Sequence, residues 1–335
     1  MTSVIKVRRA SWGMGLQGGC MSVKRGMKLW TTIARPILEY GAKIWQREGD
    51  HKWEKVEKIQ KEMGVKILRC SKTVADAFVR GELGWWTLRA RRVMLRLRYW
   101  GKLVRMDDSR LAKQVYRESK RDHDDWESKA RPERRKKLKA GVRNWCSYTH
   151  ELLRTVGLGE HWDDLTTVKD AAAWAAMVEE KVAKWEHARW RKEVTSNKVL
   201  EVYAQLKPVW GRETYLDGHE DPTGRMWLAR LRSGRHGLAV KMGRYRKPKT
   251  PREDRTCTWC AENAHVHVVQ DERHALLVCK RYAKERQEML GALEQNHCDG
   301  SMEALQVFFG RTGEEERQRE LAMCQPVLAS ATEQQ

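Results

Sequence analysis

The chain has 335 residues, and its 66 Lys and Arg residues outnumber its 45 Asp and Glu residues to give a formal net charge of +21. No segment approaches the run of about 20 apolar residues that a membrane helix needs, so we expect no membrane partner. An apolar fraction of 41% is enough for a folded core and argues against wholesale disorder. A basic chain of this kind is predicted to meet a polyanion, and nucleic acid fits better than an acidic membrane, because no lipidation motif or apolar anchor accompanies the charge.

Residues 1–26 are basic and punctuated by Gly and Ser, which predicts a disordered lead-in. The first residues contain no apolar stretch of signal-peptide length. The eight cysteines are therefore expected to be reduced thiols or metal ligands, and the protein is expected to be nuclear or cytoplasmic rather than secreted.

Residues 27–118 are predicted to form a helical region. Apolar residues at spacings of three and four indicate one helical stripe, interrupted near Pro36, that is made of Leu29, Ile33, Ile37, Tyr40 and Ile44. A second periodic pattern follows in 51–68. A long helix is then predicted at 86–106, where apolar and aromatic residues alternate with arginines.

The rest of the chain is predicted to alternate basic segments with helices. Residues 119–143 form a basic linker or exposed loop-helix, and 144–240 form a second helical block. In that block Trp174, Val178, Val182, Trp185 and Trp190 fall near one side of a helix, and Asp221 and Pro222 have the residue types of a helix start. Residues 241–290 combine a basic loop with a Cys/His element and a helix, and 291–335 hold a last helix and a polar tail. The predicted fold class is mainly α, with one or more multi-helix bundles and a small C-terminal CCHC zinc-knuckle element.

The Cys/His element has the spacing C-x2-C-x13-H-x4-C, formed by Cys257, Cys260, His274 and Cys279. Two thiolates three positions apart can chelate one ion from a tight turn, and His and Cys can complete the tetrahedral S/N set that Zn²⁺ prefers. A closed set of four ligands predicts a structural Zn²⁺ rather than a catalytic one. His265 and His267 are rival nitrogen ligands, and structural free thiols or redox-active cysteines are the alternatives to a metal site.

A nucleic-acid-binding surface is predicted from the basic residues and one aromatic side chain. Arg side chains match the oxygens of phosphate groups well. Trp259, between the first two cysteines, is a candidate platform for stacking a base, with packing on the following helix as the alternative. The candidate contacts are Arg89, Arg92, Arg96, Arg230, Arg232, Arg235, Arg244, Arg246, Lys247, Lys249, Arg252 and Trp259.

Several motifs together carry a resemblance to a known family. The segments LWTTIARPILEYGAKIW, WEKVEKIQKEMGVKIL and RGELGWWTLRARRVMLRLRYWGKLVRMDDSRL resemble the region that follows the polymerase domain in non-LTR (LINE-type) retrotransposon reverse transcriptases. The segments RMWLARLRSGRHGLAVKMGRY, RTCTWC and DERHALLVCKRYAKER resemble the C-terminal zinc-knuckle part of the same proteins, and the order is the same over about residues 27–290. The spacer between the Cys pair and the His is longer than the family pattern.

The resemblance implies a segment that helps to hold element RNA or target DNA during target-primed reverse transcription, with the rest of the reverse transcriptase as a possible partner. By motif position it assigns the zinc ligands to the same two cysteines, histidine and third cysteine. The family's polymerase aspartates have no counterpart: the pairs at 107–108, 124–125 and 163–164 are expected to be helix caps or solvated turns. No Gly-rich phosphate loop, nucleophile elbow or catalytic triad is visible, so no small-molecule substrate is expected. Whether the chain belongs to an enzyme stays open, and the alternatives are a helical protein-interaction scaffold or a non-functional remnant of the element.

Overall fold

The computed structural model describes residues 22–45, 51–129, 144–216, 222–284 and 287. Residues 1–21 of the expected lead-in, most of the predicted linker, Asp221 and the predicted C-terminal helix and tail lie outside these residues. Residues 23–26 were also expected to be disordered, but they belong to helix α2 (Val23–Leu29), which corrects that expectation. Among the described residues the chain is mainly helical, as predicted, and its only β pairing consists of two isolated bridges, Leu83 with Arg212 and Thr256 with Val269. None of the described helices combines the length and apolarity needed to cross a membrane.

The chain folds into two compact units that are interleaved along the sequence. The first contains the described residues of Ala34–Lys58 and Trp86–Arg189, and the second those of Ile5–Ile33, Ile59–Trp85 and Trp190–Gln335. The predicted ranges 27–118 and 144–240 therefore each contribute to both units. Two long helices, α5 (His51–Leu68) and α12 (Ala171–Ser196), are each divided between the units.

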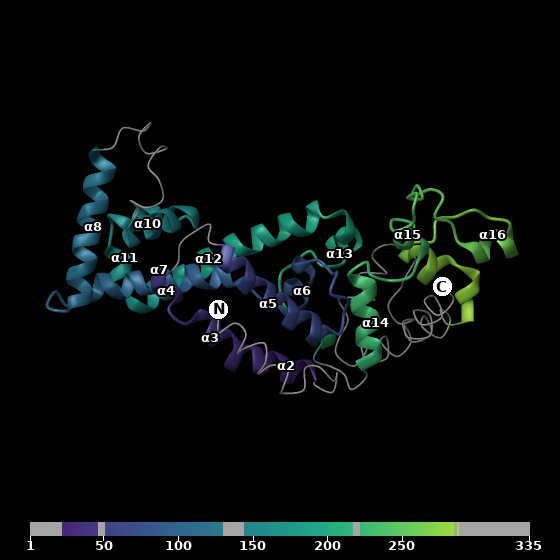
Figure 1. Ribbon diagram of the computed structural model, residues 1–335, viewed down its shortest axis with the longest axis horizontal. Coiled ribbons are helices and arrows are strands. Elements are labelled where there is room, and N and C mark those ends of the chain that lie inside the picture. The colour runs from purple at the N-terminus through teal and green to yellow at the C-terminus, as the bar shows by residue number, and fades with distance from the viewer. Residues whose placement is uncertain (1–21, 46–50, 130–143, 217–221, 285–286, 288–335) are drawn as a thin grey trace. The chain divides into compact units, whose positions relative to one another are not determined.

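The first unit is built around one long helix, α7. Further helices of this unit pack on or near α7 (Figure 1). Helix α7 spans Leu88–Arg105, and the helices around it are α3 (Arg35–Glu39), α4 (Ala42–Trp45), α8 (Leu111–Lys129), α10 (Trp145–Thr155), η3 (Gly159–Trp162) and α11 (Thr166–Lys169). The predicted linker 119–143 thus begins inside a helix, since α8 continues to Lys129.

Helix α7 begins at a capping residue, and its apolar side is buried in the core of the first unit. The Thr87 hydroxyl accepts a hydrogen bond from Ala90 N at 3.1 Å, which satisfies one free amide of the first turn. Trp100 is fully buried and contacts two further indoles, stacking on Trp162 and meeting Trp174 edge to face with ring centroids 5.9 and 5.3 Å away. Aromatic pairs of this geometry add stability beyond their buried area. The core of the first unit is therefore rich in tryptophan.

The second unit contains mostly shorter helices. They are α2 (Val23–Leu29), η2 (Trp30–Ala34, shared with the first unit), α6 (Asp76–Leu83), η4 (Lys198–Leu200), α13 (Glu201–Leu206), η5 (Thr214–Leu216), α14 (Pro222–Arg232), α15 (Ala239–Met242), α16 (Thr258–Ala264), η6 (His274–Val278) and η7 (Lys280–Tyr282). Every residue of α6 from Ala77 to Leu83 is buried. Trp190 donates from Nε1 to Ala77 O at 2.8 Å, and Phe78 meets Tyr203 edge to face.

The tryptophan pattern of α12 is confirmed in the core. Trp174, Val178, Val182 and Trp190 are buried, and Trp185 is half-buried. Their spacing of three, four and five positions keeps them near one side of a continuous helix. Pro222 begins α14, as its residue type predicts.

Of the apolar stripe predicted near the start of the chain, only Leu29 is buried. Ile33, Ile37, Tyr40 and Ile44 are each at least 41% exposed, whereas the buried residues are Leu29, Trp30, Ala34, Leu38 and Ala42. A π-helical turn over Trp30–Ala34 explains the difference, because it inserts about one extra residue and rotates the following residues around the axis. The large Trp30 side chain then takes the buried place and stacks on Trp85.

Candidate metal centre

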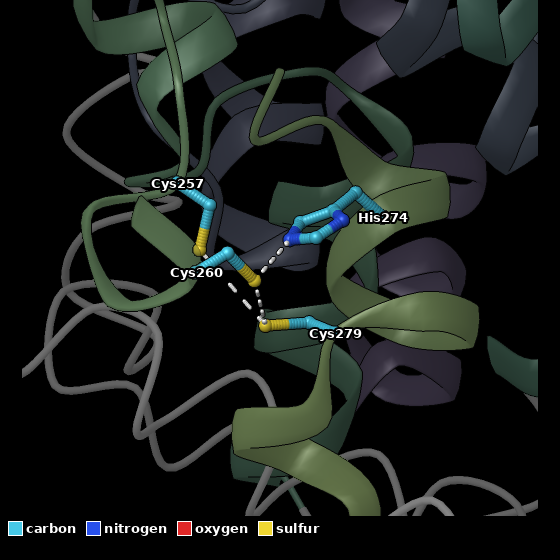
Figure 2. A group of neighbouring side chains, drawn as sticks. All are labelled: Cys257, Cys260, His274 and Cys279. Carbon is cyan, nitrogen blue, oxygen red and sulfur yellow. Dashed lines mark hydrogen bonds between the residues drawn. The ribbon is translucent and has the colours of Figure 1, made fainter. Parts of the chain in front are cut away.

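The Cys and His residues of the C-x2-C-x13-H-x4-C element converge in the second unit (Figure 2). Cys257 is the residue just before α16, and Cys260 lies in the first turn of that helix. His274 begins the π-helical turn η6, and Cys279 follows its last residue. All four side chains are buried, and their ligand atoms lie within 4.8 Å of one another. These residues could hold one metal ion.

Cys260 and Cys279 connect the rest of the group. Cys260 Sγ lies 3.7 Å from Cys279 Sγ and 3.5 Å from His274 Nε2. Cys279 Sγ also lies 3.9 Å from Cys257 Sγ. Figure 2 shows the three sulfur atoms and the imidazole nitrogen pointing toward a common centre.

Backbone hydrogen bonds bring the two halves of the motif together. Cys257 N donates to Val268 O at 2.8 Å, and Gln270 N donates to Arg255 O at 2.9 Å. These bonds flank the isolated bridge between Thr256 and Val269, so the chain entering the first cysteine runs antiparallel to the chain leading to His274. Residues 265–269 (HVHVV) are rich in β-branched valine, but this segment forms a single β bridge, at Val269, rather than a strand.

The second half of the motif depends on a π-helical turn. Cys279 N donates to His274 O at 2.7 Å, and a hydrogen bond between residues five positions apart is the bond of a π-helix. A π-turn places residues five apart one above the other, so the H-x4-C spacing puts both side chains on one side of the turn. His274 N donates to Asp271 Oδ1 at 2.8 Å, which fixes the start of this turn.

A buried charged group supports the histidine end of the element. Glu272 accepts a hydrogen bond from His236 Nε2 at 2.9 Å and contacts Lys241 Nζ at 3.1 Å, and all three side chains are buried. Burial alone would raise the pKa of Glu272, but the bond from His236 and the charges of His236 and Lys241 lower that pKa to about 2. Glu272 is therefore a carboxylate that ties α15 to the segment before His274.

Burial also acts on the thiols of the group. It raises the pKa of Cys260 above its ordinary value and raises the pKa of Cys279 to about 12. Buried thiols of this kind stay protonated unless a positive charge stabilises the thiolate. A bound cation is the species that would do so among four converging ligand atoms.

Only one of the three candidate histidine ligands lies in the Cys/His group. His274 is buried in the group, whereas His265 and His267 are exposed and lie outside it. His265 has a left-handed backbone with φ of 53° and ends α16, so its role is in the turn between the two halves of the motif. The nitrogen that faces the sulfur atoms is His274 Nε2.

Three of the arginines expected to contact phosphate are buried instead, which corrects that expectation for Arg92, Arg96 and Arg232. Arg92 approaches Glu57 at 3.7 Å, and Arg96 lies over the ring of Trp145. Arg232 binds the buried carboxylate of Glu82. In the sequence these arginines alternate with apolar residues, a pattern that is typical of a helix with one solvated side. In the structure each of them contacts a partner within the fold.

The other expected contacts remain at least partly accessible. Arg230, Arg235, Arg244 and Trp259 are half-buried, and Arg89, Arg246, Lys247, Lys249 and Arg252 are exposed. Arg235 donates to Thr73 O at 2.7 Å and Arg230 lies over the Trp227 ring, so these two also have roles within the fold. The accessible basic residues are concentrated in 244–252, the loop that leads into Cys257.

This loop borders a basic hollow of about 1150 Å³ in the second unit. The charged residues that line it are Arg191, Lys198, Arg244, Lys249, Arg252, Arg255 and one acid, Glu201. Arg255 donates to Thr250 O and Val240 O, and Arg191 donates to Ala204 O, so these two shape the wall while keeping positive charge near it. Arg191 reaches the hollow from α12 and Lys198 from η4, both outside the basic loop. Their part in the hollow therefore could not be predicted from the sequence of the loop.

The acidic pairs have structural roles in the described fold. Asp107 Oδ1 accepts from Ser109 N and Asp164 Oδ1 accepts from Thr166 N, both at 2.9 Å, as in Asx turns. Asp124 lies within α8 and accepts from Trp162 Nε1 at 3.0 Å. The contacts of Asp107 and Asp164 agree with their interpretation as turns, whereas Asp124 lies inside a helix and accepts from an indole, which corrects the expectation for the pair at 124–125.

Comparison with protein-family models, curated proteins and solved structures gives no match.

Proposed function

We propose that the four-residue group binds a structural Zn²⁺ ion. Tetrahedral Zn–S bonds of about 2.3 Å place two sulfur ligands about 3.8 Å apart. The two Sγ–Sγ distances of 3.7 and 3.9 Å bracket that value. Four protein ligands fill a tetrahedral site, so the ion would order the element rather than activate water.

We infer further that the chain binds nucleic acid through the basic hollow and the loop 244–252. Six basic side chains against a single carboxylate around one hollow carry this proposal. Such a surface attracts phosphate groups and releases the counterions that surround them. Lys249 and Arg252 are the best candidates, because both are exposed and both line the hollow.

The metal group and the basic loop are parts of one element. Arg255 joins them: its side chain binds Thr250 O within the loop, and its carbonyl accepts from Gln270 N beside the metal ligands. A bound ion would therefore hold one end of the loop in place. Less chain entropy is then lost when the loop meets phosphate groups.

The resemblance to LINE-type reverse transcriptases suggests the biological setting. We propose that this chain is a post-polymerase segment that holds element RNA or target DNA, with the chemistry supplied by another part of the reverse transcriptase. The acidic pairs that serve turns and helix contacts are consistent with a segment without its own polymerase site.

A titration with nucleic acid tests this function. The full chain with Zn²⁺ is titrated into fluorescent single-stranded RNA, single-stranded DNA and duplex DNA at several salt concentrations, with anisotropy as the signal. The logarithm of the binding constant should fall linearly with the logarithm of salt concentration, with a slope of about −0.9 for each duplex phosphate neutralised. Absence of binding to all three ligands, or binding that does not respond to salt, would refute the proposal.

A further inference from the structure

A second group of metal-ligating side chains lies in the first unit, far along the sequence from the Cys/His element. His123 and Glu127 are one turn apart on α8, and His150 lies on α10. His123 Nε2 is 2.9 Å from His150 Nδ1, and Glu127 Oε2 is 3.2 Å from each of these nitrogens. Both histidines are buried, and Glu127 is half-buried.

A chain of hydrogen bonds fixes the tautomer of His123. Asn144 Nδ2 donates to Ser119 O at 2.7 Å, which leaves Asn144 Oδ1 as the acceptor for the Ser147 hydroxyl at 3.1 Å. With its proton directed to Asn144, Ser147 Oγ accepts from His123 Nδ1 at 3.0 Å. Because Nδ1 carries the proton, His123 Nε2 has a lone pair, and it points toward His150 and Glu127.

His123 Nε2 and Glu127 Oε2 therefore both present lone pairs to the centre of this triangle. Glu127 accepts only, and His150 Nδ1 adds a third lone pair when the proton of its ring is on Nε2. The three edges of 2.9 to 3.2 Å are close to the separation of about 3.3 Å between ligands that lie 2.0–2.1 Å from one tetrahedral ion. A divalent cation would satisfy all three ligand atoms at once.

The surrounding residues hold these ligands in position. His150 stacks on Trp162 with ring centroids 4.6 Å apart, and Trp162 Nε1 donates to Asp124, which also binds Lys120. Arg154 Nη2 contacts Glu127 Oε1 at 3.2 Å, so it orients the carboxylate and leaves Oε2 toward the histidines. Supporting contacts of this kind tune metal affinity and ligand orientation.

We propose that His123 Nε2, Glu127 Oε2 and His150 Nδ1 form a second metal site, for a divalent ion of the zinc class. Imidazole nitrogen with one carboxylate is a ligand set suited to Zn²⁺ and its neighbours among the transition metals. Three protein ligands leave a fourth position for water. The ion would join α8 to α10, whereas the proposed ion of the second unit orders the loop that meets nucleic acid, so either site can be present without the other.

Cobalt titration of the full chain separates the two sites. The chain is stripped with a chelator under reducing conditions and titrated with Co²⁺, and the absorption spectrum and metal stoichiometry are recorded. Two equivalents are expected, one with a thiolate-to-cobalt charge-transfer band and one with only the weaker d–d bands of nitrogen and oxygen ligands. In Cys257→Ser the charge-transfer site should be lost or altered, while the second equivalent persists.

Substitutions in the first unit decide the assignment. His150→Gln should lose the equivalent without sulfur ligands and retain the charge-transfer band, and His187→Gln, which changes a half-buried histidine outside the group, should bind both ions. Glu127→Gln is the second variant: it removes the charge of a half-buried side chain, and we expect at least about tenfold weaker binding of the second ion with unchanged helicity by circular dichroism. A wild-type chain that binds only the sulfur-ligated ion, or a His150→Gln chain that still binds two, would overturn the proposal and leave a hydrogen-bonded His–Glu–His group.

Discussion

Arg232 donates from Nε and Nη2 to the carboxylate of Glu82, and neither side chain has any exposed surface. Tyr215 also donates to this carboxylate, and Glu213 lies 3.2 Å from Arg232 Nη2. Burial, followed by the charge of Glu82, raises the pKa of Tyr215 well above its ordinary value, so the phenol remains a donor. The contacts connect α6 with α14 in the core of the second unit.

Breaking this ion pair should destabilise the protein severely. Arg232→Met leaves the Glu82 carboxylate buried without its main partner, and we expect a loss of about 3–5 kcal/mol in the free energy of unfolding. Urea denaturation followed by tryptophan fluorescence measures the effect. Arg98→Met is the matched control, because its pair with Glu179 is partly exposed and should contribute less than about 1 kcal/mol. Similar losses in the two variants would contradict the importance of burial.

His274, rather than its exposed neighbours, should be required for metal binding. His274→Gln removes the nitrogen that lies 3.5 Å from Cys260 Sγ, and we expect weaker zinc binding and a change in the Co²⁺ spectrum as the number of protein ligands falls from four to three. Competition with a chromophoric chelator gives the affinity. His267→Gln changes an exposed histidine of the same segment and should bind zinc like the wild type. Equal weakening in both variants would remove His274 from the ligand set.

The salt dependence of nucleic-acid binding should report on Lys249 and Arg252. If each contacts one phosphate group, Lys249→Ala with Arg252→Ala should make the slope of log K against log salt less steep by about 2. Anisotropy titrations at four or more salt concentrations measure this slope. Lys72→Ala removes an exposed lysine that does not line the hollow and should leave the slope unchanged. A double variant with the wild-type slope would place the phosphate contacts elsewhere.

Gly101 should be intolerant of a side chain. A Cβ atom at this position would lie 2.3 Å from Trp174 Cδ1 and Nε1, so the indole would have to move away from Leu97 O, to which it donates at 3.0 Å. Helix propensity favours Gly101→Ala by about 1 kcal/mol, but overpacking costs about 1–3 kcal/mol, and the buried indole has no room to yield. We expect net destabilisation in a thermal melt. Lys102→Ala, at the next and exposed position, should change the melting temperature little.

The sequence was informative where the signal is local. The C-x2-C and H-x4-C spacings predict their own geometry, since each pair lies within one helical turn or π-turn. The apolar side of α12 also follows from spacing alone. In contrast, the choice between His265, His267 and His274 depends on how residues 255–257 pair with 268–270, which one sequence does not specify.

Long-range partners account for most of what was not predicted. Glu82, the buried partner of Arg232, lies 150 positions away in the sequence. The sequence around Arg232 is basic, so local information alone predicts a surface residue there. The π-turn at Trp30–Ala34 has no clear composition signal and reversed the buried side of the following residues. His123 and Glu127 stand at a helical spacing, but the third member, His150, comes from the next helix and only the fold unites them.

Cys257 and Cys279, the first and last ligands of the Cys/His element, are only 22 positions apart. His123 and His150, the first and last residues of the second group, are 27 positions apart. Closing such short loops costs less chain entropy than closing long ones. All ligands of each group are therefore available soon after the last of them leaves the ribosome. Metal capture would be an early and local event of biosynthesis, and the availability of the ion during translation would influence how the nascent chain folds.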